Sequence, residues 1–146
     1  PEAGIRAQPR SRGLGDVYKR QTYGHDISGW PVPQGSTFVE DMKGSYEVIT
    51  FFDSLEHMED IEFVKDLDVK YACISVPDCH YFSDEWFGGW KHRKRDEHLW
   101  HFNEASLKKF MDRMGYDVIN TCNVEDITRE NGQDYTNILT GIFKKR

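Results

Sequence analysis

The sequence lacks three features that would each define a class of protein. No stretch approaches the roughly 18 consecutive apolar residues of a membrane span, so no membrane segment is expected. The basic start is not followed by an apolar run, so a secretory signal is not expected either. Cysteine is scarce, because Cys73, Cys79 and Cys122 form an odd set without close spacing, which does not suit a disulfide framework. These absences together favour the cytoplasm.

Basic residues are also in deficit, since 19 Lys and Arg stand against 25 Asp and Glu for a net charge of −6. This balance argues against a broad nucleic-acid-binding surface. What the chain does have is aromatic residues, at 14% of its length, which is more than a disordered chain carries. A length of 146 residues suits one folded domain.

The charge is unevenly spread along the chain. Residues 1–21 hold five bases and two acids, so the other 125 residues carry a net charge of −9. The segment Asp16–Gln21 reads like a translated sequencing-library adapter, GAT-GTG-TAT-AAG-AGA-CAG. We therefore expect residues 1–21 to be non-native and disordered, and the domain to occupy 22–146. A basic arm or a targeting peptide is the alternative, and the codons for residues 16–21 decide between them.

Residue patterns place strands and helices in alternation. β-Branched and aromatic runs, or short apolar runs ended by acids, proline or turn residues, predict strands at 22–26, 37–41, 46–52, 70–76, 116–124 and 134–143. Helical spacing of apolar residues predicts helices over 53–67 and, after an Asn103 cap, 104–114, with a long loop over 77–102 between them. This order predicts an α/β fold with a mostly parallel sheet and helices on both faces. The closely spaced last two strands add one antiparallel strand.

Three segments carry a family resemblance: residues 23–28 (YGHDIS), residues 46–57 (YEVITFFDSLEH) and residues 98–110, which begin HLWHF. With this strand order they resemble class I S-adenosylmethionine-dependent methyltransferases, especially types 11 and 23. The resemblance implies a Rossmann-like sheet, S-adenosylmethionine as cofactor and a small-molecule, sugar or metabolite acceptor. The family's first strand and Gly-rich loop should precede Asp26 and are missing there. The segment 22–146 therefore resembles the C-terminal three quarters of the domain, and we expect it to be inactive as such.

The resemblance also implies which residues contact the cofactor. An acid at the end of the second strand accepts the ribose hydroxyls in such sheets. The implied contacts are Asp26 to the ribose, Ile27 to the adenine, Asp41 to the adenine amino group, Met42 to the ring face, and Phe52 and Asp53 to the pocket wall. Each has an ordinary alternative, namely a turn aspartate, a solvated acid pair or a core phenylalanine.

The acceptor side is expected to be formed by the long loop. Loops without their own secondary structure are often functional. A base for a hydroxyl or amine acceptor should titrate near the working pH, which favours histidine, so His57, His98 and His101 are the catalytic candidates. Trp86, Trp90 and Trp100 are the candidates that shape the pocket. The alternative is a small aromatic cluster that packs under the loop.

A metal site is the weaker interpretation of two further patterns. Asp53, Glu56 and His57 share one face of a helix, and two carboxylates with an imidazole suit a borderline metal. Carboxylates in a first helical turn also stabilise the helix dipole, which explains them without a metal. The cysteines and histidines of the loop lack the paired spacing of a zinc site. No metal is therefore expected.

Two other functional classes remain open from the sequence. One is a nucleotide- or nicotinamide-binding Rossmann-type enzyme, which needs a fully parallel strand order. The other is a non-catalytic binding module that uses the basic and aromatic loop 86–101, where charge and stacking surfaces occur together. No residue identifies the methyl acceptor or the oligomeric state.

Overall fold

The computed structural model describes residues 21–25, 31–32, 34–128 and 135–146. Two compact units divide the chain, Pro1–Gly44 and Ser45–Arg146, and each is described by itself. Among the described residues the longest helix has ten residues, and none has the length and apolar character needed to cross a membrane.

The first unit holds a parallel pair of short strands, β1 (Thr22–Gly24) and β2 (Ser36–Phe38). The side-chain oxygens of Thr22 and Ser36 lie 2.9 Å apart, and Val39 N donates to the Gly24 carbonyl at 2.9 Å. Both predicted strands are therefore present, but each ends before the acid that was expected to close it.

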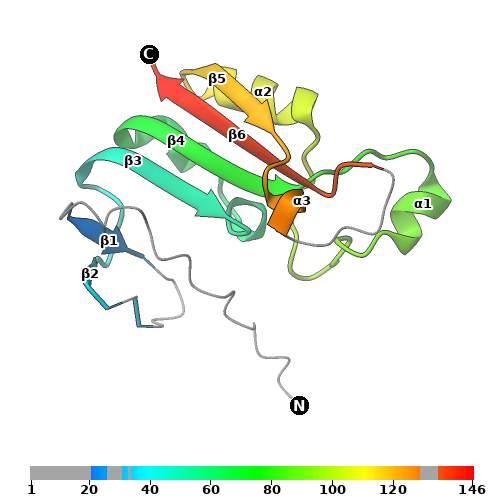
Figure 1. The fold of residues 1–146 in the computed structure, drawn as a ribbon, viewed down its shortest axis with the longest axis horizontal. Helices are drawn as coiled ribbons and strands as arrows, with labels where there is room; N and C mark the ends of the chain where they lie inside the picture. Colours follow the sequence, from blue (N-terminus) through cyan, green and yellow to red (C-terminus); the bar gives the residue numbers. More distant parts are fainter. Residues whose placement is uncertain (1–20, 26–30, 33, 129–134) are drawn as a thin grey trace. The chain divides into compact units, whose positions relative to one another are not determined.

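The second unit is built on a four-stranded sheet in the order β3-β4-β6-β5. Its strands are β3 (Ser45–Phe52), β4 (Asp68–Pro77), β5 (Tyr116–Cys122) and β6 (Ile138–Lys145). β3 pairs parallel with β4, whereas β6 pairs antiparallel with both β4 and β5. Three strands thus share one direction and the last strand opposes them (Figure 1). This arrangement confirms the predicted mostly parallel sheet with one antiparallel strand near the C-terminus.

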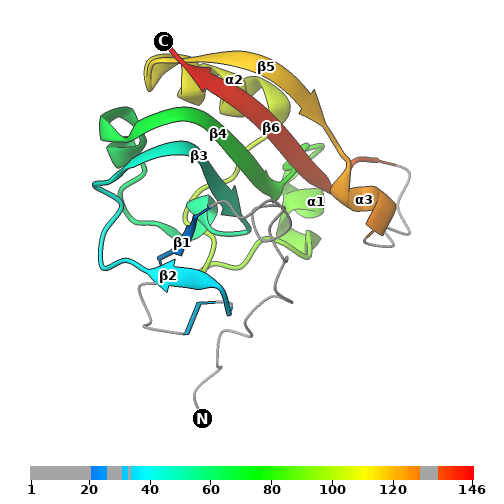
Figure 2. The same ribbon diagram turned by 60° about the vertical axis from the view of Figure 1, so that its left-hand side comes forward.

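One face of this sheet packs against helix α2 (Glu104–Arg113), which lies beside β5 in both views (Figures 1 and 2). Leu107 and Met111 of α2 are fully buried, as is Phe143 of β6. Gly141 leaves room for this packing, because a Cβ there would lie 2.5 Å from the Phe143 ring and 3.5 Å from Leu107. The apolar residues at helical spacing in α2 therefore pack into the core, as the sequence predicts.

The ends of α2 also follow the sequence signals. Asn103 Oδ1 accepts from Ser106 N at 2.9 Å, and Asn103 N donates back to Ser106 Oγ at 2.9 Å, which completes a capping box. Gly115 follows with a φ of 86°, the left-handed conformation that glycine adopts at a helix end.

The predicted helix over 53–67 is wrong. The structure has two short 3-10 segments there, η2 (Leu55–His57) and η3 (Glu62–Asp66). Met58 between them is extended, with a ψ of 133°, and its carbonyl accepts from the Trp100 indole at 2.8 Å. The apolar residues recur every third position, which is the period of a 3-10 helix rather than an α-helix. Val64 is nevertheless fully buried.

Two short helices were not predicted. Helix α1 (Asp84–Gly89) interrupts the expected loop 77–102, with Ser83 as N-cap accepting from Trp86 N at 3.1 Å. Helix α3 (Glu125–Thr128) lies before β6, and its Glu125 accepts a hydrogen bond from Ser75 of β4. Ser75 points away from the α2 face, so helices contact both faces of the sheet.

Candidate active site

The site lies where the parallel strands β3 and β4 end. Ligands of open α/β sheets bind outside the carboxyl ends of the strands. Two non-glycine residues that follow these ends adopt left-handed backbone conformations, Asp53 with a φ of 47° and Tyr81 with a φ of 48°. Such conformations cost on the order of 1–3 kcal/mol and cluster at functional sites. Asp53 N donates to the Ser75 carbonyl at 3.0 Å, which ties this turn to β4.

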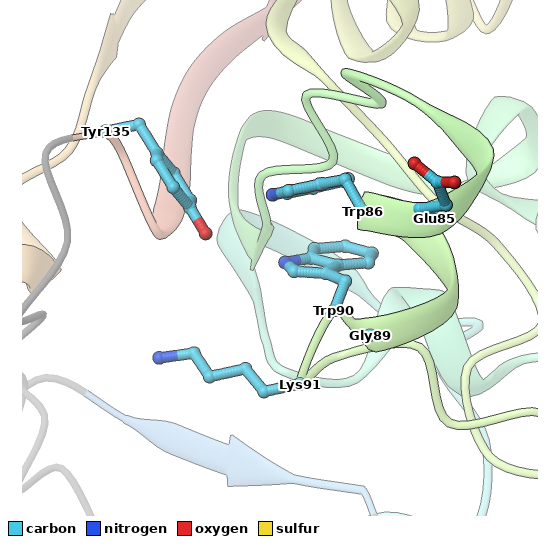
Figure 3. A pocket seen from close by; sticks show the side chains of 6 residues that line it. All are labelled: Glu85, Trp86, Gly89, Trp90, Lys91 and Tyr135. Carbon is cyan, nitrogen blue, oxygen red and sulfur yellow. The ribbon is translucent and has the colours of Figure 1, made fainter.

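A cavity of about 350 Å³ opens beside α1. Its lining residues are Glu85, Trp86, Gly89, Trp90, Lys91 and Tyr135. The indoles of Trp86 and Trp90 are stacked, with ring centres 5.4 Å apart, and the Tyr135 ring lies across the cavity from them (Figure 3). A volume of this size and aromatic walls are typical of a small-molecule site.

Helix α1 and the segment before β6 position these aromatic rings. The rings of Tyr135 and Trp86 lie 6.1 Å apart, and His80 contacts the Tyr135 ring at 5.1 Å. His80 Nε2 lies 2.7 Å from the Thr136 carbonyl, and Asp78 N donates to the Asn137 carbonyl at 3.0 Å. The segment before β6 is thus held against the segment after β4.

A second group of side chains lies at η2 and is called here the Glu–His–His cluster: Glu56, His57 and His98. One donor atom from each residue lies within 4.8 Å of the others. The imidazole rings of His57 and His98 meet edge to face at 4.5 Å, and His57 Nε2 lies 3.8 Å from Glu56 Oε1. Glu56 is 1% exposed and His98 is 7% exposed, so two of the three are removed from water.

Burial sets the charge of the histidines in this region. Burial, reinforced by His57 and Lys94, lowers the pKa of His98 to about 4. Burial also lowers the pKa of His92 and, together with Arg93, the pKa of His101. His98 is therefore uncharged at neutral pH, and the other two are biased the same way. Neutral imidazoles accept protons or bind metals.

His92 connects the cluster with the cavity. Its ring lies 6.3 Å from that of His98 and 5.5 Å from that of Trp90, which lines the cavity. Its Nε2 lies 3.0 Å from Asn137 Oδ1, which fixes the ring. The ring of His101 also lies near that of Trp90, with ring centres 5.8 Å apart. Its Nε2 is buried and has no hydrogen-bond partner among the described residues.

The structure therefore brings together five of the six predicted acceptor-side residues. His57 and His98 form one group, and Trp86, Trp90 and His101 form the other. Trp100 is not among the residues that line the cavity, and its indole N–H instead donates to the Met58 carbonyl.

The predicted cofactor residues fall in separate places. Asp26 and Ile27 lie outside the described residues. In the first unit, Met42 is half-buried, and the exposed Asp41 accepts from Lys43 N at 3.1 Å. That hydrogen bond and the Lys43 ammonium lower the pKa of Asp41. In the second unit, Phe52 ends β3 with 41% of its surface exposed.

Sequence reasoning missed Tyr135, His92 and Asn137. Tyr135 lies 45 residues beyond Trp90 and follows a polar stretch, so no local pattern links the two. The signal that was available is the Ser83-Asp84-Glu85 start of α1, which is a helix N-terminus placing Trp86 and Trp90 one turn apart.

Two of the four cations in the basic part of the loop, residues 91–95, are engaged within the chain. Arg93 lies over the Phe87 ring at 4.8 Å, and Lys94 pairs with Glu97 at 2.9 Å. These contacts leave fewer cations for the phosphates that a nucleic-acid-binding module would need.

A model of the family described as "Methyltransferase domain" matches residues 8–121, which is most of the chain. The chain belongs to this family. The methyltransferase is similar to a solved structure, the methyltransferase domain of bacterial CtHen1-C, with a TM-score of 0.55 and 14% sequence identity. The likeness covers 86% of this chain and 77% of that one. At this identity it shows the fold, which is that of class I S-adenosylmethionine-dependent methyltransferases. No curated protein sequence matches the chain.

The strand order of the methyltransferase also bears on the nicotinamide alternative. That class needs a fully parallel sheet. Here β6 runs antiparallel to both of its neighbours. The antiparallel strand and the family match together favour the methyltransferase over a nicotinamide-binding enzyme.

Proposed function

We propose that the protein transfers a methyl group from S-adenosylmethionine to a small-molecule acceptor held in the cavity beside α1. The observation that carries this proposal is the aromatic cavity beside α1, in the segment that follows β4, with His101 in contact with its Trp90 wall. Its volume of about 350 Å³ suits a metabolite rather than a polymer chain.

The candidate cofactor residues have the chemistry that the adenosine end requires. Ribose hydroxyls and the adenine amino group are donors, and the lowered pKa of Asp41 keeps its carboxylate an acceptor. Met42 and the exposed Phe52 offer apolar surface to a planar ring. We assign Asp41 and Met42 to the adenine, Phe52 and Asp53 to the pocket wall, and Asp26 and Ile27 to the ribose and adenine.

When bound, S-adenosylmethionine supplies a methyl group on a sulfonium, and the acceptor forms a bond to that carbon while the C–S electron pair passes to sulfur. The stacked indoles of Trp86 and Trp90 would hold the acceptor in one orientation, which is the main contribution that positioning makes to a displacement. The surrounding aromatic rings exclude water from the reacting atoms.

An acceptor hydroxyl or protonated amine must lose a proton, and we assign its removal to His101. Its Nε2 has no hydrogen-bond partner among the described residues, and its ring touches the cavity wall at Trp90. The pKa of His98, at about 4, makes that imidazole a weak base at neutral pH. His57 and His98 are assigned to positioning the acceptor indirectly, through the ring of His92, which neighbours that of His98.

Saturation-transfer NMR with S-adenosylhomocysteine tests the cofactor assignment, because the method detects weak binding. We expect stronger saturation of the adenine and ribose protons than of the homocysteine protons, since the contacts that we assign are to the adenine and the ribose. S-Inosylhomocysteine, which lacks the adenine amino group, is the matched control ligand and should be saturated less.

The variant Asp41→Asn, with Lys43 retained, tests the same assignment from the side of the protein. It should weaken saturation of the adenine protons while leaving the folded NMR spectrum unchanged. Absence of saturation in the folded chain at millimolar ligand, or stronger saturation of a nicotinamide dinucleotide, would overturn the proposal.

A further inference from the structure

The Glu–His–His cluster has a geometry that its sequence positions do not suggest. Glu56 and His57 are neighbours in η2, whereas His98 comes 41 residues later. The predicted helix face would have grouped Asp53 with Glu56 and His57. In the structure His98 is the third residue, and the three donor atoms lie within 4.8 Å of one another.

The backbone holds these two segments together independently of the side chains. The Glu56 carbonyl accepts from Leu99 N at 2.8 Å and from Trp100 N at 3.2 Å. The Trp100 indole then donates to the Met58 carbonyl at 2.8 Å. His98 is therefore fixed beside η2 by three hydrogen bonds, which is the preorganisation that a ligand set needs.

We propose that Glu56, His57 and His98 bind a divalent cation of borderline character, such as Zn²⁺ or Co²⁺. Two imidazoles and one carboxylate are the donor set that such ions favour, whereas Mg²⁺ and Ca²⁺ favour oxygen ligands alone. Bonds of about 2.1 Å to a common ion place ligand atoms roughly 3–4 Å apart, so the cluster needs only a small closure.

An ion pair between Glu56 and His57 is the competing explanation for the cluster. Their closest approach is 3.8 Å, which is beyond hydrogen-bond distance. An ion pair also does not explain why a second imidazole, that of His98, packs edge to face against His57. A cation explains all three side chains at once, because each supplies one donor atom.

Three protein ligands would leave a coordination position open, as in catalytic rather than structural metal sites. His57 is the half-exposed member, so the ion has a route from solvent. His92 lies between the cluster and Trp90 of the cavity. A role for the ion in orienting an acceptor oxygen rests on the proposed function, but cation binding itself does not.

The experiment is a calorimetric titration of the chelator-treated chain with Zn²⁺, with Mg²⁺ as the control ion. We expect one equivalent of Zn²⁺ to bind and Mg²⁺ to bind far more weakly. His57→Ala and His98→Ala should each lower the affinity for Zn²⁺ by at least about 10- to 100-fold, because even the loss of a residue that only supports a metal ligand has an effect of this size. His80→Ala is the matched control, because His80 also lies near a carboxylate, Asp78 at 3.6 Å, outside the cluster.

Two further measurements keep the result interpretable. His57 is half-exposed, so His57→Ala should fold even where His98→Ala does not, and circular dichroism checks both. A Co²⁺ absorption spectrum separates imidazole from thiolate binding, because the chain has three free cysteines. Loss of binding in His57→Ala with retention in His80→Ala supports the site. No binding to the folded chain, equal binding by His57→Ala, or a Co²⁺–thiolate band overturns it, and none of these results depends on methyl transfer.

Discussion

The substitution Gly141→Ala tests the packing of the sheet that carries the site. Gly141 lies in β6 opposite Ile74, on the face that packs against α2. An added Cβ would lie 2.5 Å from Phe143 Cε2, 2.6 Å from Phe143 Cζ and 3.5 Å from Leu107 Cδ2. A Cβ atom essentially never approaches a nonbonded heavy atom more closely than 3.0 Å, so the ring must move. Phe143 and Leu107 are both fully buried, so neither has free space to enter.

Overpacking of a buried site by one methyl group costs roughly 1–3 kcal/mol. We expect Gly141→Ala to lower the free energy of unfolding by that amount, measured by urea denaturation with an unchanged slope. Gly89→Ala is the matched control, because a Cβ there meets nothing within 4 Å. In the double variant Gly141→Ala/Phe143→Leu the smaller side chain should recover part of the loss, as a double-mutant cycle would show. A Gly141→Ala chain as stable as the parent would refute the packing between β6 and α2.

Two other predictions concern the sheet and helix α2. Tyr116 donates to the Val64 carbonyl at 3.1 Å, and burial raises its pKa from 10 to about 12, so the folded state holds its proton longer than the unfolded state does. Its contribution to stability is therefore present below pH 10 and falls as the pH rises towards 12. At pH 8, urea denaturation should show Tyr116→Phe to be about 1 kcal/mol less stable than the parent chain. At pH 11 this difference in the free energy of unfolding should be smaller by about 1 kcal/mol. Asn103→Ala removes the acceptor of the α2 capping box and should cost about 1 kcal/mol by the same assay, whereas Asn103→Asp should keep most of it, and an equal loss in both would contradict the capping role.

The strands were predictable because their signals are local. The run 46–52 is β-branched and aromatic, and Pro77 marks the end of β4. The same is true of α2, where Asn103 and Gly115 mark the two ends. The segment 53–67 was not predictable in this way, because the carbonyl of Met58 accepts a hydrogen bond from the indole of Trp100, which is distant in the sequence. A tertiary hydrogen bond replaced the helical one.

The candidate site shows the same division. Its residue types, histidine and tryptophan in the long loop, were visible in the sequence. Their grouping was not, because it depends on backbone hydrogen bonds between Glu56 and residues 99–100 and on the return of β6 to β4, which places Tyr135 beside Trp86. The assignment of residues 1–21 to an adapter stays a prediction, which the codons test.

The proposed ligand-binding edge is formed by the carboxyl ends of β3 and β4. Backbone amide NMR of the labelled chain, titrated with S-adenosylhomocysteine, tests it residue by residue. We expect shifts at Phe52 and Asp53, and none at Ser45 and Asp68, where the same two strands begin. Shifts confined to the beginnings of the strands, or no shift in the folded chain at millimolar ligand, would contradict it.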